Sequence, residues 1–375
     1  MKRILFVYTQ MPNPTKGGVE RVTSILIRNL TERGHVCKFL LLKSKEFGFD
    51  RLFFEGKEVE DLRTFLRVHF IDVIINQCYT SSFTRKYKSC KIDTIKYITC
   101  YHDAPGTLLI GLRHRLACSS NLLRRILLLI YPLYKIITHY KYRKDLQVNY
   151  NESDSYILLS HRFSEALFSE LGIHSSSKVS AIPNPLSFEL TKNQKCTKEK
   201  IAIVVARLEE SQKRVSESLY IWSMFKQSEY GKDWILYIIG DGQDKLNYMR
   251  LTSSLGLSES VIFTGRTDPI PYYTKAKLFF MTSSHEGWGL TITESMQFGV
   301  VPIAYNTYAS LLDIIIDNKT GFIIPDKCRS LFLQRIIYLS SSEEIFNNMS
   351  SSCMERAKLF SQENIANMWN MLIGE

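Results

Sequence analysis

Residues 283–299 read S-S-H-E-G-W-G-L-T-I-T-E-S-M-Q-F-G, and this stretch indicates how the chain folds. The apolar run Leu278–Met281 directly before it predicts a buried strand. The glycines at 287 and 289 then predict a loop, followed by a helix that Gly299 ends. A strand, a glycine-containing loop and a helix N-terminus together form a site for an anion, because the first amides of a helix have no partner within it.

Two carboxylates bracket this predicted site. Glu286 lies in the loop, and Glu294 follows eight residues later in the first turn of the predicted helix. The segment Thr291–Glu294 has the spacing of a capping box, in which Glu294 would bond the amide of the cap residue. Glu294 thus has a structural explanation, whereas no structural role demands Glu286 between His285 and Gly287. Glu286 is therefore the stronger candidate for contact with a ligand.

The same succession of strand and helix recurs along the 375 residues and predicts an α/β protein with two Rossmann-like domains around a cleft. The strands expected in the first half are Ile4–Tyr8, His35–Leu42, Ile71–Asn76, Ile95–Tyr101 and Asp154–Ser160. The strands expected in the second half are Ile201–Val205, Trp234–Ile239, Val261–Thr264, Leu278–Met281, Val300–Ala304 and Gly321–Ile324. The helices expected are Val19–Leu30, Ser164–Leu171, Val215–Phe225, Asp244–Leu255, Ser310–Ile316 and a helical segment over 343–375. A polar, lysine-rich linker over 187–199 separates the first domain, 1–186, from the second.

In the first half, polar and glycine residues follow two predicted strands, at the edge where α/β sheets bind ligands. Gly17 and Gly18 lie between the first strand and its helix, where they let a ligand approach the backbone. They do not form the G-x-G-x-x-G fingerprint of dinucleotide sites, and a simple tight turn explains them as well. His102 follows the strand Ile95–Tyr101. A lone histidine is more often a structural residue than a ligand contact.

Two cations follow the first strand of the second half. Arg207 and Lys213 are the residue types that bind a diphosphate, with Arg214 as an alternative to Lys213. The null explanation is a solvated basic turn. The sequence holds no Asp-x-Asp pair, so we expect no metal ion and assign the charge of a diphosphate to these cations and to helix amides.

The net charge of +11 lies in the first half of the chain. Residues 1–186 hold 28 Lys and Arg against 16 Asp and Glu, and eight of these cations lie in the acid-free segment 111–144. That segment is also rich in leucine, isoleucine and tyrosine, and we expect it to be helical and broken near Pro132. It is typical of a segment that lies on an anionic membrane surface. A core helix with a solvated basic face is the alternative, and nucleic acid is a third reading that no binding motif supports.

The remaining features indicate a cytoplasmic protein. The eight cysteines form no C-x-x-C pair, as in a reduced compartment. We see no signal peptide, and the apolar run Ile126–Tyr134 is too short to span a bilayer. We expect the protein to be peripheral on the inner face of the cell membrane.

Six motifs in order along nearly the whole chain resemble one enzyme family. They are G-G-V-E-R-V at 17–22, I-P-N-P at 182–185, A-R-L-x4-K at 206–213, I-I-G-D-G at 238–242, V-I-F-T-G at 261–265 and E-G-W-G-L-T-I-T-E-S at 286–295. The chain is similar to retaining glycosyltransferases of family four, also called glycosyl transferases group one, which have the GT-B fold. Ala206 in place of the usual glycine, Ser295 in place of alanine, and an Arg207–Lys213 spacing one residue longer than common depart from the pattern.

The resemblance implies a role for each matching residue. Glu286, His102, Arg207 and Lys213 would serve catalysis. The nucleotide-sugar would be bound by Gly17, Gly18, Arg207, Lys213, Gly240, Arg266, Glu286, Gly287, Trp288, Gly289, Leu290 and Glu294. In this set Glu294 would bond the ribose, Arg266 would lie near the base, and the amides of 287–290 would meet the sugar and phosphate. The donor domain would cover 200–357, and a helix over 358–375 would return to the first domain.

The resemblance also implies an activity: transfer of a sugar, with retention, from a nucleotide diphospho-sugar to a glycan or lipid-linked glycan. Uridine diphosphate is our default nucleotide, and the product would be a cell-envelope polysaccharide such as lipopolysaccharide or capsule. No cofactor and no metal are expected. A nucleotide-sugar 2-epimerase of the same fold and a non-catalytic, membrane-associated binding subunit are the alternatives.

Overall fold

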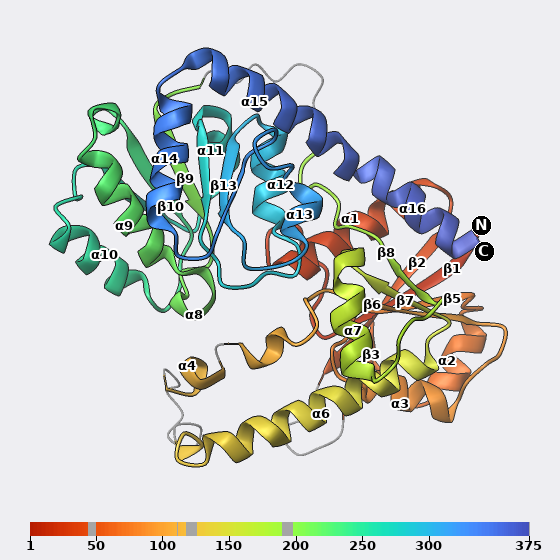
Figure 1. Cartoon of the computed structure of the whole chain (residues 1–375). Helices are drawn as coiled ribbons and strands as arrows, with labels where there is room; N and C mark the ends of the chain where they lie inside the picture. Colours follow the sequence, from red (N-terminus) through yellow and green to blue (C-terminus); the bar gives the residue numbers. More distant parts are fainter. Residues whose placement is uncertain (44–49, 111, 118–125, 190–197, 375) are drawn as a thin grey trace. The chain divides into compact units, whose positions relative to one another are not determined.

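The computed structural model describes residues 1–43, 50–110, 112–117, 126–189 and 198–374 (Figure 1). The chain divides into two compact units. Unit 1 comprises Met1–Ser187 together with Gln362–Glu375, and unit 2 comprises Phe188–Ser361. The division falls at the start of the expected linker 187–199, of which residues 190–197 lie outside the described part.

Unit 1 is built on a sheet in the order β4-β3-β2-β1-β5-β6-β7-β8. Strands β2 to β8 through β1 are parallel, and β3 and β4 add an antiparallel edge. Its strands are β1 (Arg3–Tyr8), β2 (Val36–Lys43), β3 (Arg51–Phe54), β4 (Lys57–Glu58), β5 (Val73–Asn76), β6 (Lys96–Tyr101), β7 (Ser155–Leu158) and β8 (Val179–Ala181). Its helices are α1 (Gly18–Glu32), α2 (Leu62–Val68), α3 (Ser82–Ser89), α4 (Leu112–Ala117), α6 (Tyr131–Glu152), α7 (Ser164–Leu171) and α16 (Gln362–Gly374).

The core of unit 1 lies on both faces of this sheet. Alternate residues of β1 point to opposite faces, so Ile4 and Phe6 join one apolar cluster and Leu5 and Val7 join another. The first cluster is closed by α1 and by the last helix of the chain, α16. Three residues of α16 at helical spacing, Ile365, Trp369 and Ile373, are buried in it.

Unit 2 is built on a fully parallel sheet in the order β11-β10-β9-β12-β13-β14. Its strands are β9 (Ile201–Val205), β10 (Ile235–Ile239), β11 (Val261–Gly265), β12 (Leu278–Met281), β13 (Val301–Tyr305) and β14 (Phe322–Ile324). Its helices are α8 (Glu210–Lys213), α9 (Val215–Lys226), α10 (Lys245–Ser254), α11 (Ile270–Lys275), α12 (Leu290–Gln297), α13 (Leu311–Ile314), α14 (Arg329–Ser340) and α15 (Glu343–Ala357). This strand order reverses direction between β9 and β12, as in a doubly wound sheet.

The predicted α/β class is confirmed, and each predicted strand is present to within a few residues. Two helix predictions are wrong in detail. The expected helical segment over 343–375 is interrupted, because α15 ends at Ala357, a 3-10 turn follows, and Ser361 is extended before α16 begins. Pro132 does not break a helix but stands in the first turn of α6, where its missing amide hydrogen costs nothing.

Within the described ranges, no helix is both long enough and apolar enough to cross a membrane.

Candidate functional site in unit 2

The candidate site lies at the carboxyl ends of β9 and β12, the two strands between which the strand order reverses. The chain leaves β9 toward Arg207 and the short helix α8, and it leaves β12 into the loop 282–289 that precedes α12. In parallel sheets this reversal leaves a crevice in which ligands bind. The sequence stretch 206–213 and the stretch 283–299 therefore come together at one point of the fold.

Hydrogen bonds join the two segments. The amide of Ser284 donates to the carbonyl of Gln212 over 2.7 Å. In return, Nε2 of Gln212 donates to the carbonyl of His285 over 3.2 Å. The Ser284 hydroxyl also contacts the carbonyl of Gln212 at 3.2 Å. These bonds fix the end of α8 against the loop that carries Glu286.

Lys213 and Glu286 form an ion pair at the centre of this arrangement. Nζ of Lys213 lies 2.5 Å from Oε1 of Glu286, and the two side chains are only 17% and 10% exposed. A partly buried pair of this kind holds each charge in a fixed position, because neither side chain has free water to replace its partner. The structure thus brings together two of the predicted site residues.

Arg214, the alternative to Lys213, is bound elsewhere. Its guanidinium donates to the carbonyls of Thr282 and Ser283 and forms an ion pair with Asp326 at 2.8 Å. It anchors the end of β12 from behind. Lys213 rather than Arg214 is therefore the cation that faces Glu286.

Arg207 has a different environment from Lys213. Its side chain is 64% exposed and contacts Glu209 at 2.9 Å and Gln212 at 3.1 Å. An exposed pair contributes little to stability, and an exposed guanidinium is free to turn toward an anion.

Helix α12 begins directly after the loop, and its N-terminal amides are uncapped by any described side chain. The cap residue is Gly289, whose φ of 94° is in the left-handed region that favours glycine. A Cβ atom at Gly289 would also lie 3.0 Å from the hydroxyl of Tyr308. The amides of the first turn, which include that of Leu290, have no partner within the helix and are suited to bind an anion.

The predicted capping box is wrong. Because Gly289 is the cap, Thr291 lies inside the first turn of α12 and does not cap it. Glu294 is instead 1% exposed, and its Oε2 accepts a hydrogen bond of 2.8 Å from the hydroxyl of Tyr273. Its structural role is therefore a buried side-chain contact, and its contact with a ribose stays a prediction.

The other predicted residues of unit 2 lie around the same sheet edge. Gly240 follows β10 with a φ of 142°, and a Cβ there would meet the carbonyl oxygen of Ala206 at 1.9 Å. Only glycine fits this approach to the β9 loop. Arg266 is exposed directly after β11. The Trp288 ring is buried edge-on against Phe360, so the loop presents its backbone and not its indole.

In unit 1, His102 lies directly after β6 and is buried. Neither ring nitrogen has a hydrogen-bond partner among the described residues. Burial lowers the pKa of His102 to about 4, so the ring is neutral at pH 7. It lines a cavity with Gln77 and Asn184 whose free volume is about 10 Å³, the space of about one water molecule.

Gly17 and Gly18 stand at the N-terminus of α1, as the cap and the first residue of the helix. The carboxylate of Glu20 folds back over them, so that a Cβ at Gly17 would meet its Oε2 at 2.6 Å. A carboxylate in the first turn already satisfies the positive end of the helix. The structure therefore gives the anion site expected at this turn no support from α1 alone.

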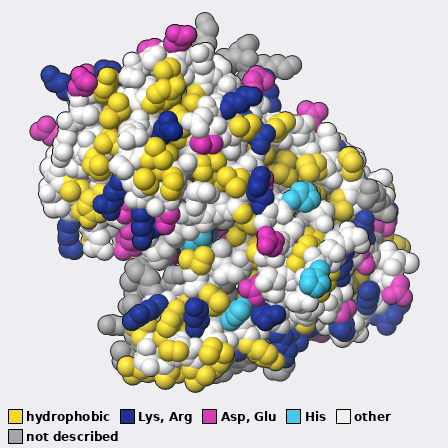
Figure 2. Space-filling model, in the orientation of Figure 1, with side chains coloured by type: hydrophobic (Ala, Val, Ile, Leu, Met, Phe, Trp, Pro, Cys, Tyr) yellow, Lys and Arg dark blue, Asp and Glu magenta, His cyan; other side chains and the backbone are white. Residues whose placement is uncertain are grey.

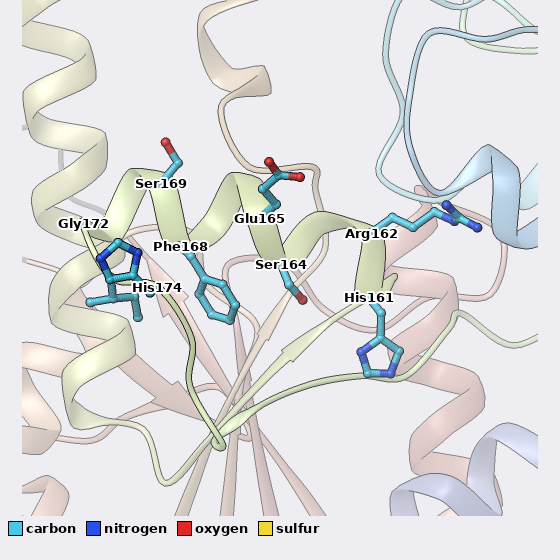
Figure 3. A pocket seen from close by; sticks show the side chains of 9 residues that line it. His161, Arg162, Ser164, Glu165, Phe168, Ser169, Gly172 and His174 are labelled. Carbon is cyan, nitrogen blue, oxygen red and sulfur yellow. The ribbon is translucent and has the colours of Figure 1, made fainter.

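A groove of about 750 Å³ that the sequence did not signal runs along α7 in unit 1 (Figure 3). Its lining residues repeat at helical spacing on one face of α7, and they include the imidazoles of His161 and His174 at its two ends. Arg162 and Glu165 add opposite charges. The groove shares none of the predicted site residues.

No group of three or more His, Cys, Asp or Glu side chains suited to a metal ion occurs in the part of the chain that the structure describes.

Comparison with known proteins agrees with the geometry of unit 2. Residues 188–359, nearly the whole of unit 2, match the family model of glycosyl transferases group 1. An uncharacterized glycosyltransferase of Haemophilus influenzae is 24% identical over 199 residues, which are 53% of this chain and 56% of that protein. The amylovoran biosynthesis glycosyltransferase AmsD of Erwinia amylovora is 25% identical over 177 residues, 47% of this chain and 48% of that protein. The chain thus spans about half the length of the curated relatives it matches.

The solved structures show the fold. S. aureus TarM, crystallised with UDP, fondaparinux and alpha-GlcNAc-glycerol, superposes with a TM-score of 0.72 at 13% identity over 100% of both chains. Together with the two doubly wound parallel sheets, this likeness identifies the fold as GT-B.

Proposed function

We propose that this chain is a glycosyltransferase that moves a sugar, with retention of configuration, from a nucleotide diphospho-sugar to a glycan or a lipid-linked glycan. One observation carries the proposal. Lys213, the loop of Glu286 and the uncapped N-terminus of α12 meet at the strand reversal of the unit that matches glycosyl transferases group 1. A cation beside free helix amides suits a diphosphate, and the carboxylate of Glu286 suits sugar hydroxyls.

The proposed chemistry needs no covalent intermediate with the protein. The bond from the sugar anomeric carbon to the diphosphate oxygen breaks as the acceptor oxygen attacks the same face. The departing phosphate oxygen takes the acceptor proton. Lys213, Arg207 and the α12 amides stabilise the negative charge that develops on that leaving group, which is the main contribution that the protein makes.

The remaining predicted residues would position the donor. Glu286 would hold the sugar hydroxyls, Glu294 the ribose, and Arg266 the side of the base. His102, Gly17 and Gly18 of unit 1 stay predictions, of which His102 is the better supported, since its buried ring nitrogens have no described partner. The UDP in the TarM crystals supports uridine diphosphate as the nucleotide, and the amylovoran enzyme supports a polysaccharide product. Metal ions are not required in this scheme.

Nucleotide release tests the activity. The protein is incubated with UDP-glucose, UDP-galactose and UDP-N-acetylglucosamine, with and without a lipid extract of the cells that make it, and released UDP is measured. We expect release that depends on the extract, and the anomeric configuration of the product, read by NMR, to equal that of the donor. Release without extract, with an epimeric sugar, would identify a 2-epimerase. Saturable nucleotide binding without any release would identify a binding subunit.

We also propose that the surface of residues 126–144, called here the α6 face, lies on an anionic membrane on the cytoplasmic side. The first half of α6 and the turn before it contain no buried side chain, whereas the second half packs into unit 1 through Tyr142, Leu146 and Asn149. The exposed apolar residues are Ile126, Leu129, Ile130, Leu133, Ile136, Ile137 and Tyr140, at 41% to 83% exposure for the exposed large apolar residues between 110 and 140.

Cations border this apolar strip. Lys135, Lys141, Arg143 and Lys144 are all exposed, and the space-filling view shows basic side chains beside hydrophobic ones over α6 (Figure 2). An exposed apolar strip with flanking cations suits insertion at the boundary between headgroups and acyl chains, because the cations reach the anionic headgroups while the apolar side chains leave water. A solvated helix would not need the apolar strip.

Flotation with vesicles of phosphatidylglycerol and phosphatidylcholine tests the α6 face. We expect the protein to float with these vesicles at low salt and less so at high salt, since the ionic part is screened. Leu133→Glu and Ile136→Glu should abolish flotation, whereas Leu246→Glu, at a position of unit 2 that is 65% exposed, should not. A protein that stays in the soluble fraction at low salt would refute the proposal.

A further inference from the structure

The loop after β13 supports the loop of Glu286 from below. The hydroxyl of Thr307 donates to the carbonyl of Ser283 over 2.6 Å, and the hydroxyl of Ser310 donates to the carbonyl of Gly287 over 3.0 Å. Tyr308 stands between these two anchors. The loop 306–310 therefore holds the Glu286 loop at both ends and places one aromatic side chain beneath it.

The hydroxyl of Tyr308 is buried and has no partner among the described residues. The residue is 6% exposed, and its oxygen lies close to the backbone of Gly289, where a Cβ atom would be 3.0 Å away. Burial and the negative charge of Glu286 hold the pKa of Tyr308 well above 10, so the group keeps its proton and can donate. A buried hydroxyl without an acceptor is unfavourable and needs an explanation.

The nearest acceptor of the right charge is already in use. The carboxylate of Glu286 pairs with Nζ of Lys213 at 2.5 Å. In this arrangement Lys213 is neutralised by Glu286 and is not available to a phosphate. A diphosphate that takes Lys213 therefore releases a carboxylate three residues from Gly289, against which the Tyr308 hydroxyl lies.

We propose that Tyr308 is a positioning residue for the donor, and that Glu286 exchanges its ion pair with Lys213 for a hydrogen bond from the Tyr308 hydroxyl when a nucleoside diphosphate occupies Lys213. This inference rests on the proposed function, because it needs a diphosphate at Lys213. The ligand-free protein lacks the Tyr308 hydrogen bond and the bound protein gains it. Tyr308 thus contributes to the affinity for the diphosphate and not to the stability of the free protein.

Tyr308→Phe removes the hydroxyl and keeps the ring. We expect the melting temperature of the free variant to equal or exceed that of the wild type, since an unpartnered hydroxyl is lost. The Kd for UDP, measured by titration calorimetry, should rise about tenfold or more, the value of one hydrogen bond to a charged acceptor. Tyr305→Phe is the matched control, because its hydroxyl contacts Glu217 at 3.3 Å, and it should leave the Kd unchanged.

A double-mutant cycle separates exchange from simple packing. Because Tyr308 acts through Glu286, Tyr308→Phe should raise the Kd for UDP in the wild type and not in the Glu286→Gln background. A lower melting temperature with an unchanged Kd, or equal effects in both backgrounds, would overturn the inference. If the wild type binds none of UDP, GDP, ADP and dTDP, the proposed function fails as well. If it binds one of them and Tyr308→Phe binds that nucleotide equally, this inference alone fails.

Discussion

Arg207 and Lys213 are both cations at the β9 edge, but their surroundings give them different tasks. Lys213 is largely buried against Glu286, so its charge is placed before any ligand arrives. Arg207 is mostly exposed beside Glu209, so it must turn to reach an anion. A fixed cation and a mobile cation together suit a group that gains charge as it departs, because the mobile one can follow the charge.

Arg207→Ala should lower kcat by about 10²–10³, the loss seen when one donor to a developing anion is removed. The melting temperature should not change, since an exposed ion pair contributes little to stability. Steady-state kinetics and thermal unfolding of the same preparation measure both quantities. Lys200→Ala, which removes another exposed and paired cation of unit 2, serves as the control. Near-normal turnover of Arg207→Ala would remove Arg207 from the mechanism.

His102 should make the stability of unit 1 depend on pH. Its pKa is about 4 in the folded protein and 6.5 ordinarily, so the unfolded chain binds an extra proton between these values. Stability is therefore complete above pH 6.5 and falls as the pH drops toward 4, by about 2 kcal/mol between pH 7 and pH 4.5. Urea unfolding at both pH values should show a smaller loss for His102→Asn than for the wild type. Equal losses would show that the ring is not buried as a neutral group.

At the scale of elements, the strand–loop–helix 278–297 depends on one glycine. Gly289 combines a left-handed backbone with a close approach to Tyr308. Gly289→Ala should lower the free energy of unfolding by about 1–2 kcal/mol through the backbone alone and should also displace the loop of Glu286 and weaken nucleotide binding. Gly172→Ala is a matched control, because Gly172 has a φ of 71° and open space around it. We expect it to lose a similar stability and no affinity; equal nucleotide affinity in both variants would contradict this account of the loop.

Helix α16 should stabilise unit 1 although it is the last element of the chain. Trp369→Ala removes a large side chain from the cluster that α16 forms with α1 and β1, at a cost of about 3–5 kcal/mol. Met371→Ala, on the exposed side of the same helix, should cost little. Urea unfolding followed by circular dichroism compares the two variants. Equal stability of Trp369→Ala and the wild type would show that α16 does not close this core.

The sequence predicts these elements well where the pattern is strong and local. Buried parallel strands such as Ile201–Val205 and Leu278–Met281 are short apolar runs, and the structure keeps their bounds. The amphipathic strand β3 and the helices α2 and α3 carry a weaker pattern and were not predicted. The start of α12 was misplaced by two residues, because Thr291 and Glu294 have cap spacing while the left-handed Gly289 takes the cap.

The candidate site shows the same limit. Glu286, Arg207 and Lys213 could be named from the sequence, because residues that follow parallel strands converge at one edge of the sheet. The ion pair of Lys213 with Glu286 and the commitment of Arg214 to Asp326 depend on side-chain geometry, which spacing does not give. Tyr308 carried no signal apart from its place after β13.

At the scale of the whole molecule, two doubly wound units carry different charges. The positive charge is concentrated in residues 1–186, whereas the candidate donor site lies in unit 2. This division matches a protein in which one unit binds the soluble nucleotide-sugar and the other attaches to an anionic surface through the α6 face. The central claim is that unit 2 binds a nucleotide diphosphate through Lys213 and Arg207 at the β9 edge.

Ligand-dependent thermal unfolding tests that claim most directly. A panel of nucleotide sugars is added to the wild type, to Arg207→Ala/Lys213→Ala and to Lys200→Ala/Lys275→Ala, which removes two exposed and paired cations of unit 2. A ligand that binds only the folded state raises the melting temperature, by about 5 °C when it is well above its Kd. We predict this rise with a UDP-sugar for the wild type and the control pair, and its loss in Arg207→Ala/Lys213→Ala. An equal rise in all three proteins, or no rise with any nucleotide sugar, would contradict the account.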